Sequence, residues 1–392
     1  TITADSNVGS CGFVNGQVDV SAFNSSTFVI VWGDETDDNY QYAIYDNTGS
    51  LILGPTVIYN VTDRTGWSSI SVSAFNSSVF GVAYFDPDAT TDVHYSTYTS
   101  SGTAISTAND LTSTEIVYSV SISALNSTTA VISYVDQTDD DASFQVWDYL
   151  GNQAVAETDI DTEVEISYQT SVSALNSSLF VYGYLDDFDN DISFGISYSN
   201  GSGYVSPIDV DSSIGTQWHT PVAVATINET LFVIAWWDND GSNDISFQTY
   251  YSNGTAFSDV VDASDIGAEY LDVASYAAST GISICEDNET FVIAFANSSG
   301  GYIESYYSNG SMWNGICLET DPCICPGLNN NWEIGLSDNC YIDSDCDLGT
   351  GKLSFTGTGT ATCGANIYTS SLGDPGSGGT LFIDSTCTIF VS

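Results

Sequence analysis

The chain has 392 residues, and its 51 Asp and Glu side chains face two basic ones, Arg64 and Lys352, which gives a formal net charge of -49. Such a surface repels phosphate backbones and anionic lipids, so nucleic acid and anionic membranes are excluded as partners. An apolar fraction of 42% and an aromatic fraction of 13% exclude a disordered chain, and we expect a folded protein with a large core.

The first fourteen residues precede any repeat. Residue 1 is Thr, and residues 1–14 contain neither basic side chains nor the apolar core of a signal peptide. We expect that a signal peptide has been removed, the alternative being a truncated chain. This extension is a candidate strand, either for closing a blade within the molecule or for pairing with a neighbouring subunit.

Strand-forming residues dominate the chain that follows. Val, Ile, Tyr, Phe and Trp are abundant, Lys, Arg and Met are nearly missing, and no long 3.6-residue periodicity occurs. The sequence therefore predicts an all-β fold. The longest apolar runs, such as "LFVIAWW", reach about a third of the ~20 residues that a membrane helix needs, so we expect no membrane span.

A motif of about fifty residues repeats over residues 15–318. Its opening is written "DVSAFNSSTF", "SVSAFNSSVF", "SISALNSTTA" and "SVSALNSSLF" in the first four copies. Alignment on this opening gives spacings of 52, 50, 50, 52 and 60 residues between Asn24, Asn76, Asn126, Asn176, Asn228 and Asn288. A period of this size is typical of propellers, solenoids and arrays.

Each repeat contains four strand-like runs separated by turn residues. The first run is rich in Ser and Ala, which suits an innermost strand near a crowded axis, and the second is apolar throughout, which suits a strand covered on both faces. The third carries an aromatic residue at matching positions: Tyr42, Tyr95, Phe144, Phe194 and Phe247. These features predict a six-bladed β-propeller with four-stranded antiparallel blades, because a row of independent sandwiches would need about 100 residues per domain.

One face of this propeller is predicted to carry sugar. In an antiparallel blade the first and third connections emerge on one face, and nine of the eleven N-x-S/T triplets fall in these connections. We interpret all eleven asparagines as N-glycan acceptors of a secreted protein. The alternative, that Asn-Ser makes a good tight turn, is compatible with glycosylation. The acceptors are Asn24, Asn60, Asn76, Asn126, Asn176, Asn200, Asn228, Asn253, Asn288, Asn297 and Asn309.

The opposite face collects acidic residues in the second connections, after Asp34, Asp86, Asp136, Asp186 and Asp238. Clustered carboxylates suit calcium, although "DNDGSND" lacks the spacing and distal Glu of an EF-hand. Solvated turn residues and a salt-adapted surface explain the same pattern, and all three interpretations stay open. No cofactor is predicted.

The inventory of catalytic residues is small. The histidines His94 and His219 have no G-x-S-x-G serine nearby, and a single Arg excludes a sialidase-type arginine cluster. Cys323 and Cys325 are too close for the usual zinc spacing. A two-carboxylate glycosidase stays open, because only separation and burial would identify the pair. We therefore expect no enzymatic activity.

The repeat ends near residue 318, and residues 319–392 are expected to form a small disulfide-rich β domain, because about 70 residues make a marginal core. Six of the nine cysteines lie there, which allows 15 pairings, and the odd total leaves one thiol free or paired between chains. The candidates are Cys11, Cys285, Cys317, Cys323, Cys325, Cys340, Cys346, Cys363 and Cys387.

This last fifth of the chain resembles the C-terminal regions of large secreted cell-surface proteins of archaea. The resemblance depends on W-E-I, S-D-N-C and D-C-D-L-G-T-G, here at residues 332–334, 337–340 and 345–351. It implies an extracellular or cell-surface glycoprotein.

Two functions follow from these features. The first is a non-enzymatic, N-glycosylated structural protein that assembles with copies of itself into a surface filament or layer through its terminal β segments. The second is a carbohydrate- or calcium-dependent binding module on the acidic face, using aromatic residues such as Trp67 and Trp218. The source organism, the glycan composition, any ligand and the symmetry of an assembly are beyond the sequence.

Overall fold

The chain divides into two compact units, one formed by Thr1–Ile282 with Asp287–Trp313 and the other by Ser283–Glu286 with Asn314–Ser392. The computed structural model describes residues 18–34, 39–61, 69–86, 92–111, 117–136, 141–161, 166–186, 191–211, 221–238, 244–264, 270–275, 290–297, 300–311, 328–329, 331–336, 341–342, 345–356, 358–373, 379–383 and 387–391. Over these residues the structure is all-β, and none of them belongs to a helix long and apolar enough to span a membrane.

Over its described residues, the first unit contains six antiparallel sheets, or blades, whose strands follow one another in chain order. Blades 1 to 3 comprise β1 (Val18–Asn24), β2 (Thr27–Asp34), β3 (Asn39–Asp46), β4 (Leu51–Asn60); β5 (Ile70–Asn76), β6 (Val79–Asp86), β7 (Asp92–Thr99), β8 (Ala104–Asp110); and β9 (Val117–Ala124), β10 (Thr129–Asp136), β11 (Asp141–Asp148), β12 (Gln153–Asp161). Blades 4 to 6 comprise β13 (Ile166–Ala174), β14 (Leu179–Asp186), β15 (Asp191–Tyr198), β16 (Gly203–Asp211); β17 (Val222–Asn228), β18 (Leu231–Asp238), β19 (Asp244–Tyr251), β20 (Val261–Ser264); and β21 (Tyr270–Ser275), β22 (Thr290–Asn297), β23 (Gly300–Tyr307).

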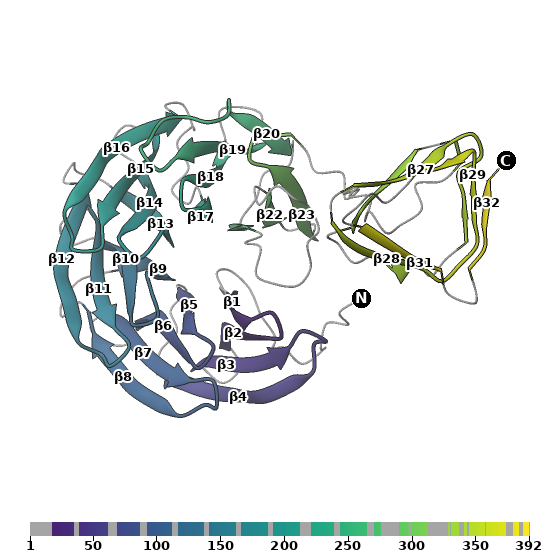
Figure 1. Ribbon diagram of the computed structural model, residues 1–392. Coiled ribbons are helices and arrows are strands. Elements are labelled where there is room, and N and C mark those ends of the chain that lie inside the picture. The colour runs from purple at the N-terminus through teal and green to yellow at the C-terminus, as the bar shows by residue number, and fades with distance from the viewer. Residues whose placement is uncertain are drawn as a thin grey trace. The chain divides into compact units, whose positions relative to one another are not determined.

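The blades are arranged radially, with β1, β5, β9, β13 and β17 towards the centre and β4, β8, β12 and β16 at the rim (Figure 1). Each innermost strand contacts the innermost strand of the next blade, from β1 with β5 to β17 with β21. The predicted six-bladed β-propeller is therefore confirmed.

Aromatic contacts between neighbouring blades form much of the core. The third-strand aromatic of one blade meets a second-strand Phe of the next edge to face, as in Phe144 with Phe180, where the ring centroids are 4.9 Å apart. The same contact recurs in the pairs Tyr42–Phe80, Phe194–Phe232 and Phe247–Phe291. The third-strand aromatics that stand out in the sequence are thus the residues that join blades.

Serine side chains connect the innermost strands. Ser119, Ser121 and Ser123 of β9 accept hydrogen bonds from the backbone N–H groups of Thr170, Val172 and Ala174, at 3.3, 3.2 and 3.0 Å. Equivalent bonds, here called serine bridges, run from Ser21 to β5, from Ser69, Ser71 and Ser73 to β9, and from Ser171 and Ser173 to β17. They satisfy the edge amides that the sheet itself leaves unpaired, which explains the alternating serines of the repeated motif.

Asp19 replaces the middle one of these serines in blade 1. Its Oδ2 accepts hydrogen bonds from Val72 N at 2.7 Å and from Ser71 Oγ at 2.8 Å. Burial raises the pKa of the Asp19 carboxyl above its ordinary value, and the hydrogen bonds lower it by a smaller amount.

The sixth blade departs from the alignment that placed its opening at Asn288. Its innermost strand is β21, which pairs from Tyr270 with Ala296 to Ser275 with Phe291. Asn288 lies in the connection between β21 and β22, outside the described residues, so its predicted role stays a prediction. The longer spacing of 60 residues is explained by this longer connection.

The second unit is a parallel β-solenoid, an arrangement that the sequence analysis missed. Its strands are β24 (Trp332–Gly335), β25 (Tyr341–Ile342), β26 (Cys346–Asp347), β27 (Lys352–Thr356), β28 (Gly359–Cys363), β29 (Ile367–Thr369), β30 (Ser371–Leu372), β31 (Gly379–Ile383) and β32 (Ile389–Val391). They form three parallel sheets, β24-β27-β30, β25-β28-β31 and β26-β29-β32, so each set of three consecutive strands makes one rung.

Buried residues from all three sheets fill the centre of the solenoid, among them Trp332, Ile342, Leu353 and Ile367. A disulfide joins Cys363 to Cys387, 24 residues apart, which confirms the predicted disulfide support. Cys346 is also disulfide-bonded, and its partner is outside the described residues. The other candidates, Cys11, Cys285, Cys317, Cys323, Cys325 and Cys340, lie outside the described residues as well.

Candidate functional site

The first and third connections of blades 1 to 5 lie side by side, as an antiparallel meander requires. In blade 1, Asn47 N in the third connection donates to Ser26 O in the first at 2.8 Å. The same bond recurs as Ser100–Ser78, Tyr149–Thr128, Ser199–Ser178 and Ser252–Thr230. These connections together form what we call the tip face.

The repeat asparagines of the first connections act as turn caps. Oδ1 of Asn176 accepts hydrogen bonds from Ser178 N at 2.9 Å and Leu179 N at 3.1 Å, and Asn24, Asn76, Asn126 and Asn228 make equivalent bonds. The tight-turn interpretation therefore holds at these five residues, and their glycosylation stays a prediction. Asn60 ends β4 and is exposed, whereas the side chains of Asn288 and Asn297 are outside the description.

The third connections of all six blades share one hairpin geometry. In blade 4, Tyr198 N donates to Ser202 O at 2.8 Å and Gly201 N donates to Tyr198 O at 2.9 Å. Gly201 has φ +87°, a left-handed conformation that favours glycine, and the glycines at this position in the other blades have φ between +81° and +86°. This is a three-residue loop closed by a glycine bulge.

On the opposite side, acidic residues lie opposite each other where the second and third strands meet. Asp136 pairs with Asp141 and Asp186 with Asp191, and all four side chains are buried. Asp34 pairs with Asn39, Asp86 with Asp92 and Asp238 with Asp244. The loops between them lie outside the described residues. Within the part of the chain that is described, no group of three or more His, Cys, Asp or Glu side chains converges on a possible metal position.

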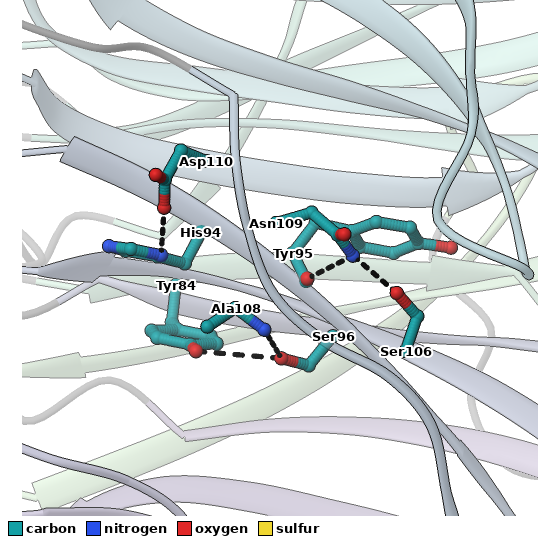
Figure 2. Close-up of polar contacts among 8 residues, drawn as sticks. All are labelled: Tyr84, His94, Tyr95, Ser96, Ser106, Ala108, Asn109 and Asp110. Carbon is teal, nitrogen blue, oxygen red and sulfur yellow. Dashed lines mark hydrogen bonds and ion pairs between the residues drawn. The ribbon is translucent and has the colours of Figure 1, made fainter.

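A second set of acidic residues lies on the rim strands. Ser143, Ser193 and Ser246, on the third strands of blades 3 to 5, donate through Oγ to Asp159, Asp209 and Asp262 on the fourth strands, at 3.5, 3.1 and 3.2 Å. In blade 2 the equivalent pair is His94 and Asp110, with Nδ1 of His94 3.0 Å from Oδ1 of Asp110 (Figure 2). At this repeat position blade 2 thus carries an imidazole, whereas blades 3 to 5 carry a serine hydroxyl.

Two tyrosine rings form a cluster with the imidazole, and their own ring centroids are 5.5 Å apart. Tyr84, from β6 of the same blade, stacks on His94 with ring centroids 5.6 Å apart, and Tyr59, from β4 of blade 1, stacks at 5.5 Å. The His94 side chain is 10% exposed, whereas that of Asp110 is 62% exposed. We call Tyr59, Tyr84, His94 and Asp110 the His94 niche. It places an exposed carboxylate beside aromatic rings where two blades meet.

The serine hydroxyls near the niche serve blade packing. Ser96 Oγ accepts a hydrogen bond from Ala108 N at 2.9 Å, and Ser106 Oγ accepts one from Asn109 Nδ2 at 2.7 Å (Figure 2). A serine nucleophile would have to face the imidazole instead. The niche therefore consists of a histidine held beside the exposed carboxylate of Asp110, which can accept hydrogen bonds.

Sequence reasoning assigned no catalytic role to His94 and missed its partner. Asp110 lies sixteen residues further on, but the same spacing separates Ser143 from Asp159, Ser193 from Asp209 and Ser246 from Asp262. Aligning the repeats at this position would have shown the exchange of Ser for His. His219, Trp67 and Trp218 lie outside the described residues.

No family model matches the sequence, and no curated protein matches it. A mutant of AofleA from Arthrobotrys oligospora is 8% identical, with a TM-score of 0.50, over 76% of this chain and 84% of that one. A six-bladed β-propeller fungal lectin with a fucose recognition mode, from Aleuria aurantia, is 11% identical, with a TM-score of 0.48, over 76% and 94%. The Hadza microbial sialidase Hz136 is 10% identical, with a TM-score of 0.45, over 74% and 65%.

At these identities the similarity concerns the fold, and the AofleA structure agrees with the propeller architecture. The resemblance of residues 332–351 to archaeal cell-surface proteins finds no support in these comparisons.

Proposed function

We propose that this protein is a non-enzymatic, extracellular carbohydrate-binding propeller, and that sugar binds at the His94 niche. The observation that carries the proposal is the exposed Asp110 carboxylate, which lies beside a histidine that stacks on tyrosines from two blades. Ionised carboxylates accept strong hydrogen bonds from sugar hydroxyls, and aromatic edges and faces pack against sugar C–H groups. The fold is one that a fungal lectin also uses, which makes fucose a reasonable first ligand to test.

The choice of His over Ser at this position supports a binding role. Ser193 and Asp209 show that a hydroxyl is enough to join the third and fourth strands. The imidazole adds a wider ring, a stack with Tyr59 of the preceding blade and a second nitrogen. These additions are unnecessary for strand pairing but useful for recognising a polyhydroxylated ligand.

The test is a glycan array followed by calorimetry on the proteins that bind. Asp110→Asn is expected to weaken binding about 10- to 100-fold, because a hydrogen bond to a charged group contributes about 1.5–3 kcal/mol. His94→Ser, which reproduces the pairs of blades 3 to 5, is expected to weaken it as well. Asp209→Asn is the matched control and should leave affinity unchanged. Equal effects of the two Asp substitutions, or no binding to any glycan, would reject the proposal.

A second candidate function is self-assembly, and the last rung of the solenoid favours it. Among the described residues, β30, β31 and β32 each pair with a strand on one side only. Four large apolar side chains of this rung are 44–58% exposed: Phe382, Ile383, Phe390 and Val391. An exposed apolar strand edge favours pairing with another strand, here that of a second copy of the chain.

Light scattering and electron microscopy of the purified protein test this second candidate. Assemblies that dissociate on Ile383→Lys and persist on Leu150→Lys, an exposed leucine of the propeller, would support it. A protein that is monomeric at all concentrations, or equal behaviour of the two variants, would reject it.

A further inference from the structure

The third connections differ in sequence between the two halves of the propeller, although their backbones are alike. Blades 4 to 6 carry Tyr-Ser-Asn-Gly-Ser or Tyr-Ser-Asn-Gly-Thr at residues 198–202, 251–255 and 307–311, which we call the tyrosine hairpins. Blades 1 to 3 carry neither a tyrosine at the first position nor an N-x-S/T triplet at residues 46–50, 99–103 and 148–152, the polar hairpins. The first-position tyrosine and the acceptor are therefore present together or absent together.

The polar hairpins use their first residue as the cap. Asp148 Oδ1 accepts hydrogen bonds from Leu150 N and Asn152 N at 2.9 and 2.8 Å, and Asp46 Oδ1 accepts from Thr48 N and Ser50 N, both at 2.9 Å. In blade 2, Thr99 Oγ1 accepts from Thr103 N at 3.0 Å. A polar first residue is thus sufficient to close this hairpin.

In the tyrosine hairpins the asparagine at the third position caps the turn. Asn200 Oδ1 accepts from Ser202 N at 3.0 Å and from Ser202 Oγ at 2.7 Å. Asn253 and Asn309 make the same two bonds with Thr255 and Ser311. No described residue forms a hydrogen bond with Nδ2 of these three asparagines, and all three side chains are exposed. The nitrogen that would carry a sugar is therefore accessible.

The tyrosine lies on the same side of the hairpin as the acceptor. Tyr198 and Ser202 face each other across the turn, since Tyr198 N donates to Ser202 O, and opposite residues project their side chains to one face. Asn200 bonds to the hydroxyl of Ser202, which brings its side chain to that face too. Tyr198 is 37% and Tyr251 40% exposed, so neither side chain is buried in the core.

A second aromatic ring holds two of the three tyrosines, Tyr198 and Tyr251, in place. Tyr204 of β16 packs edge to face on Tyr198, and Phe257 packs edge to face on Tyr251, both with centroids 5.2 Å apart. A fixed, half-exposed ring two residues before an accessible acceptor is a preformed platform for the apolar face of a sugar ring.

From this geometry we infer that Asn200, Asn253 and Asn309 are N-glycan sites whose first sugar stacks on Tyr198, Tyr251 and Tyr307. Attachment forms a bond between Asn Nδ2 and the anomeric carbon of a sugar donated by a lipid-linked glycosyl diphosphate. The bond from that carbon to the diphosphate breaks, the diphosphate leaves with the electron pair, and Nδ2 loses one proton. The inference is independent of the His94 niche, which lies in a different part of the blades.

The repeat asparagines of the first connections lack this platform. In blades 1 to 5 the residue before the asparagine is buried, as Phe75 and Leu175 show, and the residue two positions before is Ala or Thr. In addition, Asn76 Nδ2 donates to Ser127 O at 3.2 Å and Asn126 Nδ2 donates to Thr129 Oγ1 at 2.7 Å. Any glycan at these positions would have no aromatic partner within its own hairpin.

The experiment uses the full chain secreted from a host that performs N-glycosylation, with glycopeptide mass spectrometry for occupancy and thermal unfolding for stability. Asn200, Asn253 and Asn309 are expected to be occupied. A cycle of Tyr198→Ser and Asn200→Gln should show that the glycan raises the unfolding midpoint by about 2 °C when Tyr198 is present and by a smaller amount when it is absent.

Blade 2 offers a matched control. Ser101→Asn adds an acceptor to a hairpin without tyrosine, and Thr99→Tyr completes the pattern. The glycan introduced by Ser101→Asn should stabilise the protein only in combination with Thr99→Tyr. Bare asparagines at positions 200, 253 and 309, or a glycan effect that does not depend on the tyrosine, would overturn the inference.

Discussion

The propeller and the solenoid both repeat a small β unit, but they treat the edges of their sheets differently. In the propeller, the serine bridges place hydroxyls of one blade against the edge amides of the next. In the solenoid, the last rung carries exposed apolar side chains beside strands that pair on one side among the described residues. A repeat protein can thus satisfy the backbone amides at a sheet edge with side chains, without adding another strand.

The largest effect is expected from breaking the aromatic contact between blades. Phe180→Ala should lower the free energy of unfolding of the propeller by about 4 kcal/mol, because the fully buried ring packs on Phe144 and leaves a cavity. Denaturant titration followed by tyrosine and tryptophan fluorescence measures this change. Phe382→Ala, at an exposed position of the last rung, is the comparison and should cost much less; equal losses would contradict the assignment of the core.

The stability of the solenoid should depend more on its disulfide than on strand pairing at the edges of its sheets. Replacing Cys363 and Cys387 together by Ser should destabilise this unit by about 3 kcal/mol, because the bond closes a loop of 24 residues in the unfolded chain. Protease sensitivity of residues 331–391, compared under reducing and non-reducing conditions, reports the loss. A reduced solenoid as resistant as the oxidised one would show that the rungs hold without the bond.

Alkaline pH tests the core of blades 1 and 2. Burial raises the pKa of Tyr98 to about 12, whereas the unfolded chain ionises near 10. The folded state therefore keeps a proton that the unfolded state loses, and stability should be complete below pH 10 and fall by about 3 kcal/mol by pH 12. Tyr98→Phe should reduce this slope, measured by denaturant titration at several pH values. An unchanged slope would mean that Tyr98 ionises freely.

Removing one serine bridge should have the smallest effect. Ser123→Ala leaves Ala174 N without its 3.0 Å partner, which is expected to cost about 1 kcal/mol. Ser101→Ala, in an exposed hairpin away from the innermost strands, is the control and should be nearly neutral. If the two substitutions are indistinguishable, the bridges contribute nothing to the joining of blades.

Periodicity predicts much of the propeller, and its limits are physical. The alternating serines, the apolar second strands and the third-strand aromatics all correspond to repeated contacts, so the six-bladed fold follows from the sequence. The sixth blade departs from the period because the connection between β21 and β22 is longer than the equivalent connections of the other blades. The solenoid was missed because its rungs are about 20 residues long and its strands two to five residues, too short for a clear pattern.

The candidate site was harder to predict than the fold. Asp110 is one of 51 acidic residues, and only strand pairing shows that it faces His94. The tyrosine hairpins were visible as "SYSNGSG" and "YYSNGTA", but the role of the tyrosine depends on the hairpin geometry that brings positions one, three and five to one face.

Hydrogen exchange at the innermost strands tests most directly the claim that serines close the edge of each blade. The amides of Val120, Ile122 and Ala124, which donate to Ser69, Ser71 and Ser73, should exchange as slowly as the amides of β9 that bond within the sheet. They should also exchange far more slowly than the amides of β32. Rapid exchange at these three residues would contradict the account.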